Sequence, residues 1–413
     1  MDPIIRLISK GLRTDGRYFL SGGFWLLIAQ ASTIAASLIT AVFFAHYLSE
    51  NIYGTYKYII GLSAILTAFS LTGLPQAILQ ATAKGYQNFL LSSLPITIKY
   101  SFGIFLTSLT LAGYYYLNGN ATLAIGCVMI AILHPATNLF SNISSYQTGL
   151  AQFRTVSNLH TIKSIAVSGA SLAALYVTKD LLVLLFVYFL AQALVSVLSY
   201  FLLKPTKADT TVIPAKVWVS HIRYAKHTSL RTVLSKIANG LDSIVIFQYL
   251  GAAELALFSI ATLIPNQIKS SFKNLQTLLL PKYSRHESLE TLRQSIPVRS
   301  FQFLAILLTA TLLFLYFVPL LYEVLFPKYP EAIPYAQLLA LAFPASVFHI
   351  PMGALMAQKA ERSLYQFDIV TSIIQILSLI ALTYFFGLLG AVLSRVLTQY
   401  SKAILSYCLL FKN

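Results

Sequence analysis

Apolar residues fill two long stretches of the chain, 222–250 and 255–281, which are joined by a short turn at Gly251. A helix of about 20 apolar residues crosses the hydrocarbon core of a bilayer, so each stretch predicts a transmembrane helix. At about 100° per residue, polar positions gather on one side of each predicted helix. They are Thr228, Arg231, Thr232, Ser235, Asn239 and Asp242 on the first, and Ser259, Thr262, Asn266, Lys269, Ser270, Lys273 and Thr277 on the second. A charge deep in hydrocarbon costs roughly 2.5 kcal/mol or more, so these stripes predict faces that line a watery cavity or another helix.

Similar apolar runs recur along the whole chain. They cover residues 19–46, 54–81, 93–117, 120–146, 156–177 and 180–203 before the pair above, and 300–325, 332–357, 363–386 and 388–411 after it. Together with the pair, they predict an all-α integral membrane protein with twelve transmembrane helices.

The composition agrees with a polytopic membrane protein. Hydrophobic residues make up 57% of the chain and charged residues 10%, whereas soluble domains carry roughly 25% charged residues. The net charge of +16 would suggest nucleic acid in a soluble chain, but here most of the basic residues lie at the N-terminus and in or beside the loops between predicted helices. We therefore expect a lipid bilayer, and no nucleic acid, as the surroundings of this protein.

The distribution of Lys and Arg predicts the orientation in the membrane. Basic residues precede the first predicted helix and occupy the even-numbered loops, while the other loops contain Lys179 and Lys328. Cytoplasmic loops carry the excess of Lys and Arg, so both termini are expected in the cytoplasm.

Two pairs of short segments repeat about 200 positions apart. Residues 46–56 and 248–258 share Tyr-Leu, a small residue and a later small-x-aromatic triplet in one register, and residues 134–136 and 343–345 share Pro-Ala. These echoes predict two six-helix bundles, 1–204 and 222–413, joined by a cytoplasmic linker at 205–221. Six is an even number, so the halves form a parallel repeat with a pseudo-two-fold axis along the membrane normal and the substrate path between them.

Catalytic and cofactor motifs are absent from the sequence. It contains no HExxH pattern, no glycine-rich phosphate loop and no GxSxG elbow. The two cysteines, Cys127 and Cys408, lie inside predicted helices and are expected to be ordinary apolar residues, so no metal or cofactor is predicted. We expect a protein that is not an enzyme.

The remaining chemistry is a set of cations and polar groups inside predicted helices. As substrate-binding candidates we expect Lys269, Lys273, Arg231, Lys236, Lys57, Asn239, Asn266, Gln30 and Arg395. Lys269 and Lys273 lie one helical turn apart, so water, a counter-charge or an anionic substrate must relieve their repulsion. A phosphate or pyrophosphate suits such a cluster because several oxygens accept from several ammonium groups at once. Lys57 has the equal alternative of snorkelling to the interface.

Acidic and neutral polar groups give two further expectations. Asp242 and Asp368 are the ion-coupling candidates. For Asp368, an ion pair with Arg395 or Lys402 is favoured over a role in ion coupling. His134, Asn138 and Asn142, at four-residue spacing, are expected to form an interhelical polar contact.

Three segments resemble a known family. They are residues 24–30 (FWLLIAQ), residues 45–56 with Ala-His-Tyr-Leu-Ser and Tyr-Gly-Thr-Tyr, and residues 71–77 (LTGLPQA). These motifs resemble the polysaccharide-flippase (O-antigen flippase) branch of the multidrug/oligosaccharidyl-lipid/polysaccharide exporter superfamily, most strongly over the first ~85 residues.

The resemblance implies a MATE-like exporter fold that works by alternating access. It implies a flippase in O-antigen, lipopolysaccharide or capsule biosynthesis, which carries an undecaprenyl-pyrophosphate oligosaccharide across the bacterial inner membrane. A polysaccharide polymerase and a chain-length regulator are the implied partners. Lipid II flippases are typically longer by two helices, and drug exporters usually have less basic cavities.

The sequence favours a mechanism in which Lys269, Lys273 and Arg231 hold the pyrophosphate while Gln30, Asn239 and Asn266 line the space for the sugars. Four alternatives stay open. They are a cation-coupled multidrug exporter or a lipid II exporter of the same fold, an enzyme acting on lipid-linked sugars through outer-loop acids, and a non-transporting partner of a polysaccharide assembly complex.

Overall fold

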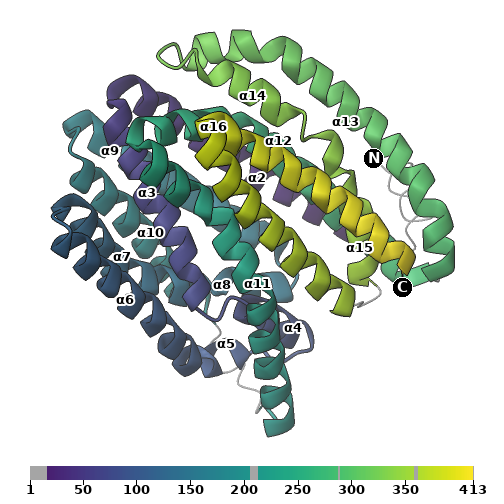
Figure 1. Cartoon of the computed structure of the whole chain (residues 1–413). Coiled ribbons are helices and arrows are strands. Elements are labelled where there is room, and N and C mark those ends of the chain that lie inside the picture. The colour runs from purple at the N-terminus through teal and green to yellow at the C-terminus, as the bar shows by residue number, and fades with distance from the viewer. Residues whose placement is uncertain (1–15, 205–212, 287–288, 358–360, 413) are drawn as a thin grey trace. The chain divides into compact units, whose positions relative to one another are not determined.

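The computed structural model describes residues 16–204, 213–286, 289–357 and 361–412 (Figure 1). Helices make up almost all of this part of the chain, and no β-strand occurs in it. The predicted all-α fold is therefore confirmed. The helices are α2 (Gly16–Tyr47), α3 (Glu50–Leu66), η1 (Thr67–Phe69), α4 (Leu74–Ala83), α5 (Phe89–Ser92), α6 (Leu94–Leu117), α7 (Ala121–Phe140), α8 (Ile143–Gly149), α9 (Phe153–Val177), α10 (Leu181–Leu203), α11 (Ala215–Leu250), α12 (Ala252–His286), α13 (Leu289–Leu325), α14 (Ala332–Ala340), η3 (Pro344–Phe348), α15 (His349–Ala357) and α16 (Glu361–Lys412).

Several of these helices have the length and composition of membrane spans. In the described ranges, seven helical stretches are long and apolar enough to cross a bilayer, or eight if the bent pair of α3 and α4 forms one span. The long helices α9, α11 and α12 fall outside this group because polar residues interrupt their apolar character. A multi-pass membrane protein is thus supported, while the number of twelve crossings stays a prediction.

The prediction of one continuous helix over 54–81 is wrong. The chain leaves the helix after η1, is extended at Ser70, and resumes in α4 at Leu74, with a bend of 60° between the two parts. Pro75 fits the restart, because proline is tolerated in the first turn of a helix.

The predicted helix over 120–146 is confirmed as one apolar stretch, Ala121–Gly149, long enough to cross a membrane. Within it, α7 ends at Phe140 and α8 begins at Ile143, while Ser141 and Asn142 between them keep helical backbone angles. Pro135 lies inside α7, where it cannot donate a hydrogen bond to the carbonyl of residue 131 and so loosens the helix before this short interruption.

Glycine divides the last long helix in two. α16 runs over 52 residues, but Gly387 within it has φ 58° and ψ −136°. Such backbone is open to glycine and strained for other residues. The predicted boundary between helices 363–386 and 388–411 is therefore confirmed at this residue.

Packing divides the chain into two compact units. Unit 1 comprises Met1–Tyr47 and Leu62–Lys236, and unit 2 comprises Leu48–Gly61 and Ile237–Asn413. The first part of α3 and the second part of α11 thus belong to unit 2. These units are defined by spatial contacts and not by sequence repeats. The predicted division into two six-helix bundles joined by a linker at 205–221 therefore stays a prediction.

Unit 1 is a layer of neighbouring helices. α6 packs on α7, α7 on α10, α10 on α9, and α9 on α2, while α4 packs on α8 (Figure 1). Hydroxyl groups connect α2 and α9: Thr33 bonds Ser164 at 3.0 Å, and Ser168 donates to the carbonyl of Ala36 at 3.2 Å. Such interhelical hydrogen bonds are worth about 0.6 kcal/mol each in membrane proteins.

Unit 2 is built around α12, which packs on α14 and α15, and α16, which packs on α14, η3 and α15. Tyr58 of α3 stacks on Phe247 of α11 with 4.0 Å between ring centroids, and Gln248 donates to the Tyr58 hydroxyl at 3.3 Å. Tyr322 of α13 donates its hydroxyl to α12, at 3.1 Å from the carbonyl oxygens of Ile260 and Ala261. Polar side chains therefore join helices in this unit as well.

Candidate substrate site

Unit 2 contains an ion pair inside its helices. Arg395 of α16 donates from Nη2 to Oδ2 of Asp242 on α11. The Asp242 side chain is 3% exposed and the Arg395 side chain 24%. The sequence predicts Asp368 as a partner of Arg395, whereas the structure pairs Arg395 with Asp242.

Two lysines, Lys269 and Lys402, lie near this ion pair. Lys269 of α12 lies within electrostatic range of Arg395, Lys402 and Asp242, and Asp242 also interacts with Lys402. We call these four residues the cationic cluster (Asp242, Lys269, Arg395 and Lys402). Lys269 is half-buried, and its ammonium makes no hydrogen bond or close ion pair among the described residues. Because Asp242 pairs with Arg395, the Lys269 ammonium has no carboxylate partner of its own in the described part of the chain.

Neighbouring side chains hold the cationic cluster in place. The guanidinium of Arg395 lies 5.7 Å from the ring centroid of Phe258, in a cation–π arrangement. Gln375 of α16 donates to the carbonyl oxygen of Ala238 at 3.0 Å and to the side chain of Asn239 at 3.4 Å. One oxygen of Asp242, Oδ1, is buried without a hydrogen-bond partner in the described structure.

The other candidates of unit 2 lie in different settings. Lys57 of α3 places its ammonium 5.3 Å from the Tyr53 ring, and no interaction with the cationic cluster is found for it in the described ranges. Asn266 is exposed on α12, and Asp368 is half-buried in the first part of α16, where its carbonyl accepts from Ser372 at 2.6 Å. Lys273 belongs to α12, but its side chain lies outside the described residues.

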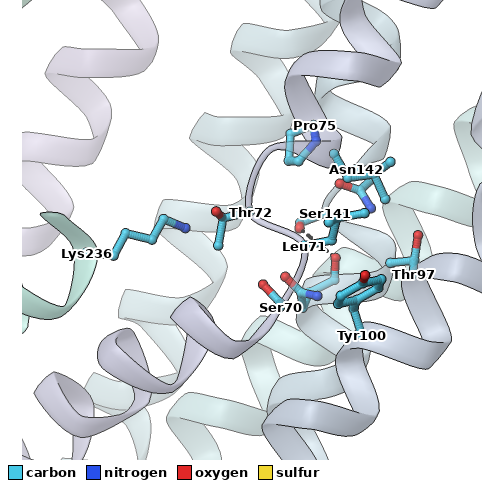
Figure 2. Close-up of a pocket in the computed structure, with 11 residues that line it drawn as sticks. Ser70, Leu71, Thr72, Pro75, Thr97, Tyr100, Ser141, Asn142 and Lys236 are labelled. Atoms are coloured by element: carbon cyan, nitrogen blue, oxygen red, sulfur yellow. Dashed lines mark hydrogen bonds between the residues drawn. The ribbon is translucent and has the colours of Figure 1, made fainter. Parts of the chain in front are cut away.

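Unit 1 holds the remaining candidates. Gln30 on α2 and Arg231 on α11 are half-buried, and Lys236 on α11 is exposed. Lys236 lines a small polar cavity beside α4 and α6, which Figure 2 shows. Asn138 donates to Ser101 at 3.0 Å, which confirms an interhelical polar contact on α7.

Two members of the site were not among the predicted candidates. Lys402 shares a helix face with Arg395, because seven positions make almost two turns, and this spacing was a usable signal. Gln375 shares a helix face with Ser372, three positions before it. Nothing in the sequence indicates that its side chain donates hydrogen bonds to residues 238 and 239 of α11. In the described part of the chain, His, Cys, Asp and Glu side chains do not gather into a metal-binding group.

One protein-family model matches most of the chain. It is described as "Polysaccharide biosynthesis protein", and it covers residues 19–287. This match includes α11 and the helical segment of α12 that carries Lys269. No curated protein sequence matches this chain significantly.

Solved structures of transporters share the fold. The lipid II flippase MurJ in an inward closed conformation has a TM-score of 0.68 at 13% identity, covering 93% of this chain and 86% of that chain. An outward-facing multidrug resistance MATE family transporter of the MOP superfamily has a TM-score of 0.61 at 12% identity, covering 96% and 95%. A MOP superfamily transporter from Pyrococcus furiosus gives 0.61 at 13% identity, again covering 96% and 95%. At these identities the likeness concerns the fold alone, and that fold is the MATE-like exporter fold.

Proposed function

Because the chain belongs to the polysaccharide biosynthesis protein family, we propose that it is a flippase that moves a lipid-linked oligosaccharide across the membrane. The substrate class we propose is an undecaprenyl-pyrophosphate oligosaccharide, such as an O-antigen or capsule repeat unit. Translocation runs from the cytoplasmic to the outer leaflet of the bacterial inner membrane, with both termini in the cytoplasm. The protein acts as a transporter and not as an enzyme.

The cationic cluster is the observation that carries this proposal. Asp242 pairs with Arg395, so the ammonium of Lys269 beside this pair attracts an anion. Uncompensated charge in a membrane is costly and marks a substrate or ion path. A pyrophosphate accepts hydrogen bonds from several ammonium groups at once, and charge-assisted bonds are roughly twice as strong as neutral ones.

The proposed mechanism assigns a separate role to each part of the substrate. Lys269, with Lys273 and Arg231, holds the pyrophosphate, while Asn239, Asn266 and Gln30 contact sugar hydroxyl groups. The lipid tail stays in the bilayer, and alternating access exposes the head group on the other side. A polysaccharide polymerase and a chain-length regulator are the proposed partners that receive the product.

A cation-coupled exporter of multiple drugs or of lipid II is the second candidate. The buried, unpartnered Oδ1 of Asp242 favours it, because a carboxylate at that depth can bind a coupling cation or a proton. The transporters of similar fold include a multidrug resistance MATE transporter and a lipid II flippase. In this candidate function Asp242 and Asp368 matter more than the lysines.

Translocation in proteoliposomes tests the proposal. An undecaprenyl-pyrophosphate oligosaccharide is placed in one leaflet, and its appearance in the other is measured with native protein, Lys269→Ala plus Lys273→Ala, and Lys179→Gln. Lys179 is exposed and keeps native transport as the matched control. We expect transport by the native protein and its loss in the double variant. Equal transport by the double variant would refute the pyrophosphate site, and absence of transport by all three would favour the drug-exporter function.

A further inference from the structure

A polar cavity in unit 1 lies beside the break before α4 (Figure 2). Ser70, Leu71 and Thr72 come from this break, and Ser141 and Asn142 come from the junction of α7 and α8. The break lies between α3 and α4, which together are apolar enough to cross a membrane. Non-helical backbone at membrane depth persists only where protein buries it or where it lines a water-filled cavity.

The walls of the cavity present mainly hydroxyl and amide groups. Asn138 directs its amide nitrogen to Ser101 at 3.0 Å, which fixes the side chain and leaves its carbonyl oxygen as an acceptor. The Tyr100 hydroxyl has no hydrogen-bond partner among the described residues. The cavity has a volume of about 60 Å³ and is open to solvent on one side. A polar space of this kind is occupied by water or by a polar ligand.

Hydrogen bonds to α11 hold the break before α4 in shape. Thr72 bonds Thr232 at 3.0 Å, and the backbone amide of Gly73 donates to the Ser229 hydroxyl at 2.8 Å. The Ser229 hydroxyl in turn donates to the carbonyl of Ala225 at 2.8 Å. The extended backbone at Ser70 and the turn at Thr72 are thus preorganised, as a binding site requires.

Lys236 places a positive charge at this cavity. Figure 2 shows its side chain reaching from α11 toward Thr72. Its ammonium has no hydrogen-bond or ion-pair partner among the described residues, and no carboxylate lines the cavity. The charge therefore disfavours a metal ion as the occupant and favours an anionic group beside hydroxyl-binding walls.

We infer that this cavity binds a sugar ring that carries an acidic group. The hydroxyl and amide groups around Tyr100 and Asn138 recognise the ring hydroxyls, and Lys236 binds the acidic group. That group is either a phosphate ester on a sugar or the carboxylate of an acidic sugar, which share the same chemistry, and it differs from the pyrophosphate proposed for the cationic cluster. The choice of a sugar rests on the proposed function, and the cavity shares no lining residue with the cationic cluster.

Binding measurements on the purified full chain in detergent micelles test this inference. The probes are N-acetylglucosamine 1-phosphate, glucuronate, uncharged N-acetylglucosamine and inorganic phosphate, each titrated calorimetrically. We expect one of the two anionic sugars to bind more tightly than both the uncharged sugar and phosphate alone. Tighter binding of the sugar phosphate assigns Lys236 to a phosphate, and tighter binding of glucuronate assigns it to a carboxylate.

Two variants connect the binding to the cavity. Lys236→Gln is expected to weaken the anionic sugar by about tenfold or more while it leaves the uncharged sugar unchanged. Tyr100→Phe removes one hydroxyl and is expected to weaken both sugars. The exposed residues Lys226 on α11 and Tyr114 on α6 supply the matched controls Lys226→Gln and Tyr114→Phe, which keep native binding.

Other results overturn the inference and leave the flippase proposal separately testable. If the anionic sugar binds Lys236→Gln as tightly as the native chain, its site is elsewhere. If no probe binds, the cavity holds water only. Native transport of lipid-linked oligosaccharide together with unchanged binding in both cavity variants would refute this site but not the transport function. Sugar binding that depends on Lys236, without any transport, would refute the function but not the site.

Discussion

Arg395 and Asp242 form an ion pair between α16 and α11 although 153 positions separate them in the chain. The aspartate is almost wholly buried, and the arginine also lies against the Phe258 ring. A buried ion pair contributes little net stability, but removal of one partner leaves an uncompensated charge. The pair therefore joins two helices and sets the charge that Lys269 and Lys402 experience.

Asp242→Asn is expected to destabilise the protein by about 3–5 kcal/mol, because Arg395 then keeps its charge without a carboxylate partner. Thermal unfolding of the purified protein in detergent measures the change. Combining it with Arg395→Met removes both charges and is expected to recover much of the lost stability. A double variant no more stable than Asp242→Asn would show that the ion pair does not determine stability at this position.

The origin of this pair explains how far the sequence predicts the site. The polar stripes on residues 222–250 and 255–281 correctly place Asp242 and Lys269 within long helices, because helical periodicity is a local property. The partner of Arg395 is not local. It depends on which face of α16 meets α11, and the sequence predicts Asp368 as the partner.

The break between α3 and α4 shows the same limit. Apolar residues continue on both sides of Ser70, so hydropathy alone predicts an unbroken helix over 54–81. Pro75 was the available signal. Proline is tolerated in transmembrane helices, however, and does not by itself distinguish a kink from a full break. The cavity beside Lys236 was therefore beyond prediction.

Gly54→Ala is expected to destabilise unit 2. A methyl group at Gly54 would lie 1.7 Å from the carbonyl oxygen of Ala252, which is backbone and cannot rotate away. Overpacking of this kind typically costs about 1–3 kcal/mol. Thermal unfolding of the detergent-purified variant measures the loss.

Gly113 on α6 provides the matched control for this substitution, since a methyl group there meets no other atom within 4 Å. Gly113→Ala is expected to leave stability unchanged or to raise it by up to about 1 kcal/mol, because alanine favours helix. Equal stability of Gly54→Ala and Gly113→Ala would mean that α3 and the α11–α12 turn do not approach so closely.

Gly387→Ala is expected to disturb α16 through the backbone rather than through a clash. A methyl group added at Gly387 would lie 3.9 Å from its nearest neighbour, Cδ2 of Leu250, which is an ordinary van der Waals contact. The strain comes from φ 58° and ψ −136° and costs about 1–3 kcal/mol for a residue with a side chain. Limited proteolysis and thermal unfolding are expected to show lower stability, whereas Gly169→Ala on α9, with open space around it, stays native. A native-like Gly387→Ala would indicate that the two parts of α16 join with different backbone angles.

Lys402→Gln is expected to lower the rate of lipid-linked oligosaccharide transport several-fold. Lys402 interacts electrostatically with both Asp242 and Lys269, so its removal reduces the positive charge available to the pyrophosphate. Lys402→Arg keeps the charge and is expected to retain most of the activity. Initial rates in proteoliposomes measure the effect, with Lys412→Gln as the control, because Lys412 is an exposed residue of the same helix.

The double variant Lys269→Gln plus Lys402→Gln separates a shared site from two independent charges. Residues that bind one substrate group together show non-additive effects, whereas distant sites add. We therefore expect the double variant to lose less than the product of the two single losses. Strict additivity would mean that Lys402 acts apart from Lys269, and an unchanged rate in Lys402→Gln would remove it from the cationic cluster that binds the substrate.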